Sequence, residues 1–235
     1  DERIIGITPA MPTGCSMNKL MNELPDRFFD VGIAEGHAVT FSAGLAKGGA
    51  LPFCNIYSSF SQRALDQIIH DVALQELPVV LCLDRGGLVG EDGATHHGCY
   101  DMSSYRCIPG TIIAAPKDEI ELKDMMYSAM LSETGPYIIR YPRGYGEGVD
   151  WQNHKFNRLE EGKGELLMEG SKVAVICAGP FANRAVEAAT KLKEETGWNP
   201  SIYNIRYIKP IDEKLLAEVA VNNDYVITVE DGTVL

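Results

Sequence analysis

The chain has 235 residues, 45% of them hydrophobic, which is enough for one or two globular domains with sizeable cores. Its formal net charge of −12 argues against nucleic acid or an anionic membrane as the main partner, while leaving room for a local basic pocket that binds a small anion. We find no signal peptide, no apolar run of about 18 residues and no CxxC pair among the six cysteines, so we expect a cytoplasmic protein with reduced thiols.

Strand-like and helix-like patterns alternate over about residues 1–145. The strand candidates are mostly continuous apolar runs, which is typical of a parallel sheet buried on both faces. The predicted strands are 3–8, 27–31, 51–58, 79–84, 111–116 and 137–142. The predicted helices are 34–47, 59–76 and 118–132, the last with Asp118 as N-cap and Glu121 completing a capping box. This order predicts an α/β fold with a doubly wound, mostly parallel sheet.

A polar segment without periodicity, residues 146–160, is predicted to be a linker. A second α/β unit follows over residues 161–235. Its predicted strands are 172–179, 201–210 and 225–231, and its predicted helices are 181–196 and 212–221. Because a doubly wound domain usually has more strands than this, we expect the second unit to be incomplete and the chain to be a fragment of a longer protein.

Ligands of open α/β sheets bind beyond the carboxyl ends of the strands, so the residues after each predicted strand are candidates for a site. Glu35 follows the second strand at the start of a helix. It is either an acid favoured by the helix dipole or a partner for a buried ligand nitrogen. After the third strand, Tyr57 and Phe60 are placed to wall a flat apolar ligand and Arg63 to hold a negative group, although Phe60 suits the core equally well.

The longest candidate loop, residues 84–101, has five glycines in 18 residues. Glycines allow the backbone to approach a ligand closely, and Arg85 suits a phosphate. His96 or His97 suits proton transfer near neutral pH. A solvated turn is the alternative reading. A metal site that includes Asp92 and the two histidines is disfavoured, because the spacing fits no common zinc pattern.

Two arginines, Arg140 and Arg143, flank Tyr141-Pro142 after the last strand of the first domain. Such a pair at the end of a sheet suggests capture of a phosphate or carboxylate, and solvation of the linker is the alternative. Neither GxGxxG nor GxxxxGK[ST] occurs, so a nucleotide-phosphate loop is not supported.

Together these segments resemble the 1-deoxy-D-xylulose-5-phosphate synthases, thiamine-diphosphate enzymes of the transketolase superfamily. The resemblance is carried by "PDRFFDVGIAEGHAVTFSAGLA", "GPYIIRYPRG" and, above all, "DRGGLVGEDGATHHGCYD". It implies a pyrimidine-binding domain over residues 1–145 and the start of a C-terminal domain over residues 161–235. The family's GDG-plus-Asn motif has no counterpart here, so ligands for Mg²⁺ and the diphosphate are expected in a missing N-terminal domain and no metal ligand is assigned in this chain.

The resemblance also implies roles at the cofactor. Glu35 matches the acid that hydrogen-bonds a ring nitrogen of the aminopyrimidine of thiamine diphosphate and thereby activates the cofactor. Phe60 matches the aromatic residue packed on that ring, and Arg63 lies in a matching string as a third cofactor-binding residue. His96 matches a histidine linked to proton transfer. One departure is Gly36, where the family usually has Gln, and a glycine there is expected to loosen the setting of the acid.

By position, Tyr57, Arg85, Asp92 and Arg143 match residues that hold the phosphorylated acceptor or order its loop. The implied reaction joins pyruvate and glyceraldehyde 3-phosphate with loss of carbon dioxide, and supplies isoprenoid, thiamine and pyridoxal synthesis. A homodimer is implied for the full-length protein, and the isolated chain is expected to be inactive. The alternatives are a separate subunit of a split transketolase or 2-oxoacid dehydrogenase, and a non-catalytic binding module.

Overall fold

The computed structural model describes residues 1–233, which form two compact units. The first unit contains residues 1–113, residues 126–144 and the described residues from Asp231 onward. The second unit contains residues 114–125 and 145–230. Within residues 1–233, no helix combines the length and the apolar character that a membrane span requires.

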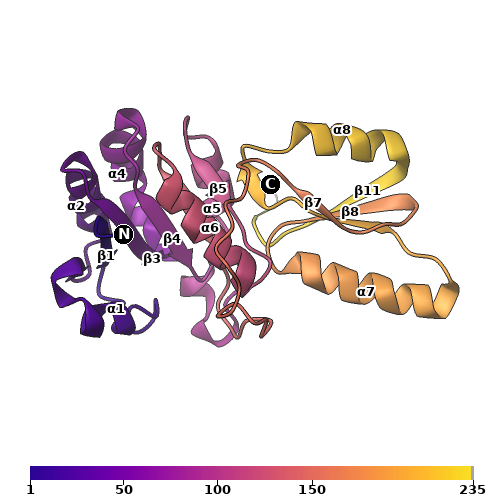
Figure 1. Cartoon of the computed structure of the whole chain (residues 1–235), viewed down its shortest axis with the longest axis horizontal. Helices are drawn as coiled ribbons and strands as arrows, with labels where there is room; N and C mark the ends of the chain where they lie inside the picture. Colours follow the sequence, from indigo (N-terminus) through magenta and orange to yellow (C-terminus); the bar gives the residue numbers. More distant parts are fainter. Residues whose placement is uncertain (234–235) are drawn as a thin grey trace. The chain divides into compact units, whose positions relative to one another are not determined.

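The larger sheet has seven strands in the order β10-β5-β6-β4-β3-β1-β2. Its strands β1, β3 and β4 are labelled in Figure 1. The pairs β1–β2, β1–β3, β3–β4 and β4–β6 all run parallel, which confirms the predicted mostly parallel sheet. The central strand β4 is buried at every position, as its continuous apolar run predicts. The strands are β1 (Ile4–Thr8), β2 (Phe28–Asp30), β3 (Leu51–Tyr57), β4 (Val80–Asp84), β5 (Ile112–Ala114), β6 (Tyr137–Arg140) and β10 (Tyr207–Lys209).

Helix α2 (Glu35–Lys47) matches its predicted bounds closely. It has an acid in the first turn and a lysine in the last, so both charges suit the helix dipole. The single helix predicted over 59–76 is instead a run of short segments that includes a π-helical turn, Ile68–Val72. Two short helices were not predicted from sequence. The remaining segments of that run and the two short helices are α3 (Ser58–Ser61), η2 (Gln62–Ala64), α4 (Leu65–Gln67), η4 (Ala73–Gln75), α1 (Asn18–Glu23) and α5 (Asp101–Arg106).

Helix α6 (Glu119–Leu131) has the predicted Asp118 cap, whereas Glu121 bonds the amide before Asp118 instead of closing a capping box with it. The carboxylate of Asp118 accepts from the Glu121 amide at 2.8 Å, and the Glu121 side chain accepts from the Lys117 amide at 2.7 Å. The segment predicted as a linker packs within the second unit, because Lys123 Nζ donates to the carbonyl oxygens of Trp151 and His154 at 2.9 and 2.7 Å.

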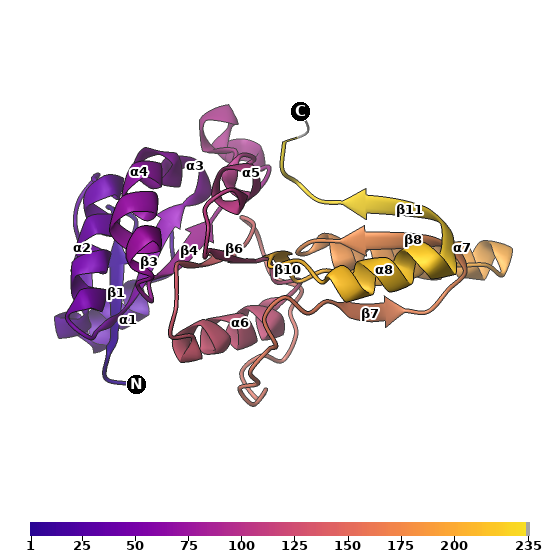
Figure 2. The same ribbon diagram turned by 90° about the horizontal axis from the view of Figure 1, so that it is seen from above.

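The smaller sheet has four strands in the order β11-β8-β9-β7, with β11 and β7 at its two edges (Figure 2). Strand β8 is parallel to β9 and β11, whereas β7 runs antiparallel to β9. Helices α7 (Phe181–Thr196) and α8 (Glu213–Asn222) lie on opposite sides of this sheet (Figure 1). The strands are β7 (Glu165–Met168), β8 (Lys172–Cys177), β9 (Ser201–Asn204) and β11 (Asn223–Val229).

The prediction of one strand over 201–210 is wrong. The chain leaves strand geometry after Asn204, and Arg206 has a left-handed φ of 55°. The predicted strand is therefore two strands: β9 belongs to the four-stranded sheet, and β10 belongs to the seven-stranded sheet. Strand β7 was also missed, because it is a four-residue, half-buried edge strand beside a glycine and carries little apolar signal.

Candidate active site

Parallel pairing brings the ends of three strands to one edge of the larger sheet. Tyr57, the last residue of β3, pairs with Asp84 at the end of β4. Leu83 in turn pairs with Arg140 at the end of β6. The segments that follow these strands therefore emerge together, which is where open α/β sheets bind ligands.

Glu35 is a buried acid with a cationic partner. It is the first residue of α2, only 5% of its surface is exposed, and Arg63 Nη1 donates to its Oε1 at 2.8 Å. The Arg63 side chain is itself 62% exposed, and its guanidinium carbon lies 5.2 Å from the centre of the Phe60 ring. A carboxylate is thus held away from water, with its partner at the rim of the site.

Gly36 leaves space that another side chain fills. A Cβ at this position would lie 3.2 Å from Gln67 Oε1 and 3.3 Å from Gln67 Cδ. That oxygen is buried and has no hydrogen-bond partner. A side chain at position 36 would therefore have to displace the amide of Gln67, and the predicted loosening of Glu35 stays a prediction.

An aromatic cluster, Tyr57, Phe60 and His96, lies between Arg63, the partner of Glu35, and Arg85. The rings of Tyr57 and Phe60 stack with centroids 5.4 Å apart, and the His96 ring meets Phe60 edge-on at 5.1 Å. Burial raises the pKa of Tyr57 to about 12, which is more than the nearby Arg85 charge can offset, so its hydroxyl stays protonated at neutral pH. His96 Nδ1 lies 2.9 Å from Thr95 Oγ1.

Arg85 is fixed from four sides. Its guanidinium carbon lies 3.8 Å from the centre of the Tyr57 ring, and its Nε donates to Asp92 at 3.0 Å. Its Nη1 donates to Asp84 at 3.1 Å and to the Gly14 carbonyl at 3.2 Å. Its φ of 62° is uncommon for a residue with a side chain, and such conformations gather at functional sites.

The second arginine, Arg143, shares a partner with the first. Asp92 Oδ2 lies 2.9 Å from Arg143 Nε and 3.0 Å from Arg85 Nε, and Arg143 Nη2 donates to Glu91 at 2.9 Å. Burial alone would raise the pKa of Asp92, but the Arg85 hydrogen bond and the Arg143 charge lower it below its usual range. We call Asp84, Arg85, Glu91, Asp92 and Arg143 the arginine cluster.

Asp84 was missed by the sequence analysis as part of the site. It is buried at the end of β4, and that burial raises its pKa to about 6 despite the opposing effect of Arg85. A carboxyl group whose pKa is raised toward neutrality beside a charged partner is typical of functional sites. The only sequence signal was its position as the final residue of an apolar strand.

Arg140 has a different role from the one predicted. It is 4% exposed, its Nε donates to Asp101 Oδ2 at 2.9 Å, and its Nη1 pairs with Asp231 at 2.8 Å. Ser58 also donates to Asp101, at 3.0 Å. The prediction that Arg140 captures a ligand anion is therefore wrong, because two carboxylates of the chain already neutralise it. Arg140 instead holds Asp101 and Asp231 beside the end of β6.

The glycine-rich loop is closed by its own backbone. Gly87 and Gly98 exchange hydrogen bonds of 2.9 and 2.8 Å, and the Val89 amide donates to His97 Nδ1 at 3.2 Å. A Cβ at Gly98 would lie 2.4 Å from both the Arg85 carbonyl and Ser58 Oγ, so only glycine fits there.

Among the described residues, no group of three or more His, Cys, Asp or Glu side chains is placed to hold a metal ion.

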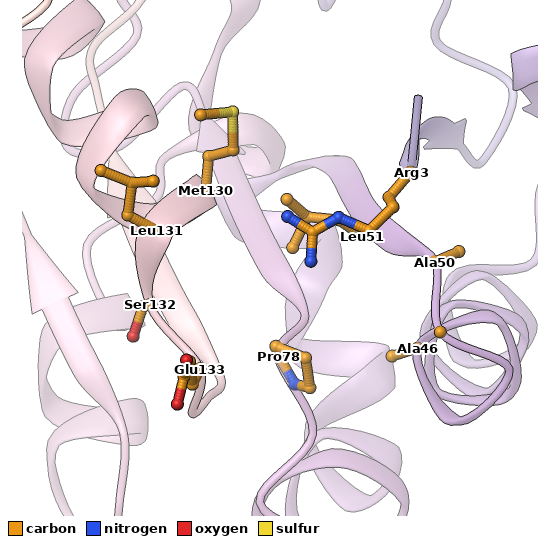
Figure 3. Close-up of a pocket in the computed structure, with 10 residues that line it drawn as sticks. Arg3, Ala46, Ala50, Leu51, Pro78, Met130, Leu131, Ser132 and Glu133 are labelled. Carbon is orange, nitrogen blue, oxygen red and sulfur yellow. The ribbon is translucent and has the colours of Figure 1, made fainter. Parts of the chain in front are cut away.

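A cavity of about 400 Å³ lies elsewhere, beside the amino ends of β1 and β3 (Figure 3). It is lined largely by apolar side chains, among them Leu51, Pro78 and Met130, and Arg3 reaches into it. Arg3 is already paired with Asp1 at 2.8 Å. None of the predicted site residues lines this cavity, and it lies at the end of the sheet opposite to the candidate site.

The structure brings the eight residues to which the resemblance assigns a place at the site into one series of contacts. The order runs from the buried acid, through the aromatic cluster, to the arginine cluster. The residues, in order of contact, are Glu35, Arg63, Phe60, His96, Tyr57, Arg85, Asp92 and Arg143. This continuity is an observation of geometry, and the roles of the residues stay predictions.

Known proteins match both parts of the chain. Residues 1–147 match the family model described as "Transketolase, pyrimidine binding domain", and residues 162–235 match "Transketolase, C-terminal domain". Among solved structures, a split-gene transketolase described as an inactive β4 tetramer is 28% identical, with a TM-score of 0.86 over 100% of this chain and 75% of that chain. A transketolase of Pichia stipitis is 18% identical, with a TM-score of 0.79 over 99% of this chain and 36% of that chain, and shows the fold alone.

Curated relatives are more similar in sequence. The 1-deoxy-D-xylulose-5-phosphate synthase of Bacteroides thetaiotaomicron is 56% identical over 99% of this chain and 36% of the relative. That of Porphyromonas gingivalis is 53% identical over 100% of this chain and 37% of the relative. The chain thus spans little more than a third of the length of these relatives. It belongs to the transketolase family, and its sequence, homologous to 1-deoxy-D-xylulose-5-phosphate synthases, matches the pyrimidine-binding domain followed by the C-terminal domain.

Proposed function

We propose that this chain contributes the pyrimidine-binding side of a thiamine-diphosphate active site. The enzyme so formed joins pyruvate and glyceraldehyde 3-phosphate, with loss of carbon dioxide, into 1-deoxy-D-xylulose 5-phosphate. The single observation that carries the proposal is the buried carboxylate of Glu35 at the start of α2, joined by continuous contacts to the two arginines. The printed names of the curated relatives support the same reaction.

The side chains fit one end of the cofactor. A buried acid beside an aromatic ring suits an aminopyrimidine, because the acid can share a proton with a ring nitrogen while the Phe60 ring packs on the flat face. When bound, thiamine diphosphate supplies a carbon nucleophile for the 2-oxo acid. We propose that ligands for Mg²⁺ and the diphosphate come from another part of the enzyme.

The other side chains divide the remaining work. Arg85 and Arg143 bind the phosphate of the acceptor through charge-assisted hydrogen bonds, with the Tyr57 ring packed on Arg85 and Asp92 lying between the two guanidinium groups. His96, edge-on to Phe60, lies between the acid and the arginines and is placed to transfer a proton at the reacting carbonyl. Arg63 holds Glu35 in place.

The test is reconstitution. The chain is mixed with the diphosphate-binding domain of the Bacteroides thetaiotaomicron relative, thiamine diphosphate and Mg²⁺, and decarboxylation of pyruvate is measured with and without glyceraldehyde 3-phosphate. We expect turnover that the aldehyde increases, and a loss of about 10²- to 10⁴-fold in Glu35→Gln. The chain alone should bind thiamine diphosphate weakly and show no turnover. A reconstituted Glu35→Gln enzyme that works at full rate would contradict the proposed role.

A second reading is favoured by one comparison. The split-gene transketolase chain covers this chain from end to end, so the chain can also be read as the separate subunit of a split transketolase. The same reconstitution discriminates the two, because a transketolase would accept ketose phosphates as donors and would not decarboxylate pyruvate. If reconstitution succeeds with neither donor, the chain is a binding module.

Assembly and location complete the proposal. We propose a cytoplasmic location for the full-length enzyme, since the six cysteines form no disulfide within the described residues and four of them are buried, as in proteins of reducing compartments. We propose a homodimer for the full-length protein, which light scattering of that protein would test.

A further inference from the structure

In the arginine cluster, the carboxylate of Asp92 lies where we propose that a phosphate binds. A single oxygen, Asp92 Oδ2, lies 3.0 Å from Arg85 Nε and 2.9 Å from Arg143 Nε. The two guanidinium groups come from different segments, one at the end of β4 and the other after β6. Two guanidinium groups that converge on one oxygen anion form the kind of arrangement that binds phosphate strongly.

Arg85 keeps its position without Asp92. Its Nη1 donates to Asp84 and to the Gly14 carbonyl, and its guanidinium rests on the Tyr57 ring. Asp84 belongs to β4 and Tyr57 to β3, so both supports are parts of the sheet. The arginine is therefore preorganised, and the bond to Asp92 is the exchangeable one.

Asp92 lies on a short turn bounded by glycines. It ends a single helical turn, Gly90–Asp92, between two glycines with positive φ, 58° at Gly90 and 83° at Gly93. A Cβ at either glycine would meet nothing within 4 Å, so there is open space beside both glycines. Glu91, the second acid on this turn, is 82% exposed and pairs with the outer arginine, Arg143. A glycine-flanked turn with few packing contacts is the kind of element that moves when a ligand arrives.

We propose that Asp92 is a resident anion that occupies the arginine pair until the phosphate of the acceptor displaces it. This inference rests on the proposed function, because it concerns the anion site of the same centre. It gives Asp92 a role in specificity: a phosphate dianion bonds both guanidinium groups and outcompetes one carboxylate, whereas a neutral aldehyde cannot open the pair. The lowered pKa of Asp92 supports the same view, because the carboxylate is ionised at neutral pH.

The experiment is a titration of the chain with inorganic phosphate at low ionic strength, followed by calorimetry and by the NMR signals of the arginine Nε–H groups. If Asp92 competes with phosphate, Asp92→Asn binds phosphate about tenfold more tightly than the wild type, the scale of one charge-assisted hydrogen bond. Asp92→Glu, which restores the charge, stays within twofold of the wild type. Arg85→Met loses saturable binding.

Two controls keep the result interpretable. Asp66→Asn removes the same charge from an exposed site that pairs with His70, and its phosphate affinity should equal that of the wild type. In the wild type itself, phosphate should shift the Nε–H signals of Arg85 and Arg143 together with the amides of Gly90 and Gly93. That second measurement holds even if Asp92→Asn folds poorly.

Several outcomes would overturn the inference. Equal or weaker phosphate binding by Asp92→Asn would show that Asp92 supports the anion site instead of competing for it. Saturable binding that persists in Arg85→Met, or no saturable binding by any variant, would remove the site. None of these measurements uses thiamine diphosphate or turnover, so failure here leaves the Glu35 test intact, and failure of that test leaves this one intact.

Discussion

Two groups of charged side chains, one in each unit, differ in how fully their charges are paired and buried. The arginine cluster of the first unit has Arg143 and Glu91 open to solvent. In the second unit, Lys117, Glu121, Glu165, Asn204 and Arg206 form what we call the glutamate network. Glu121 is 3% exposed and accepts from Arg206 Nε at 2.7 Å, from Asn204 Nδ2 at 3.0 Å and from the Lys117 amide.

The pKa values of one carboxyl group in each place move in opposite directions. Burial would raise the pKa of Glu165, but hydrogen bonds from Lys117 and Asn204 and the nearby cations lower it below its usual range. For Asp84, burial outweighs the Arg85 charge, and its pKa rises to about 6. The glutamate network thus favours folding at neutral pH, whereas ionised Asp84 opposes it. Similar residue types therefore stabilise the fold in the second unit, whereas in the first unit they form a candidate site whose ionised Asp84 lowers the stability of the fold.

The largest expected effect is the loss of a network acid. Glu121→Ala leaves Arg206 and Lys117 without their buried partner, so we expect the free energy of unfolding of the second unit to fall by about 3–5 kcal/mol in urea. Glu218→Ala, an exposed acid of α8 in the same unit, should change it by less than about 0.5 kcal/mol. A similar small loss in both variants would show that the network does not stabilise the unit.

The next effect is kinetic. In the reconstituted enzyme, Arg85→Ala should lower kcat/KM for glyceraldehyde 3-phosphate roughly 100-fold, because a desolvated charge partner of the phosphate is lost. The KM for pyruvate should hardly change. Arg3→Ala, at the opposite end of the same sheet, serves as control and should leave both constants as they are. Equal losses for both substrates would place Arg85 outside the acceptor site.

A third prediction concerns pH. The folded pKa of Asp84, about 6, lies above its ordinary value of 3.8, so the stability it contributes is present at low pH and lost as the pH rises through about 6. Between about pH 4 and pH 7 the wild type should lose about 1–3 kcal/mol that Asp84→Asn does not lose. Parallel stability curves from urea unfolding would show that burial of this carboxyl has no cost.

The smallest expected effect is a loss of stability at low pH in the second unit, opposite in direction to the effect of Asp84. Because the folded pKa of Glu165 is lowered, its contribution to stability is present above its ordinary pKa of 4.5 and lost as the pH falls. Below about pH 4 the wild type should lose about 1 kcal/mol that Glu165→Gln does not, the scale of a partly exposed ion pair. Thermal unfolding at several pH values measures this, and a variant that follows the wild type would contradict it.

Much of the first sheet was predictable, because its strands are apolar at almost every position. The residues after those strands were predictable as a site for the same reason: carboxyl ends of parallel strands share one edge, so Glu35, Tyr57, Arg85 and Arg143 had to converge. Arg140 was not predictable. It precedes Arg143 by three residues, and nothing local shows that Asp101 and Asp231 reach it from distant parts of the chain.

By itself, the sequence determined the parallel α/β order, the bounds of α2 and the family membership, since these depend on local apolar patterns and on motifs within short segments. Only the tertiary structure decided which charges are satisfied. It broke the 201–210 strand at Arg206, buried Arg140 between two acids and set Asp92 between two arginines. The physical reason is that an ion pair depends on atoms a few ångströms apart in space, and residues brought that close can be more than forty positions apart along the chain.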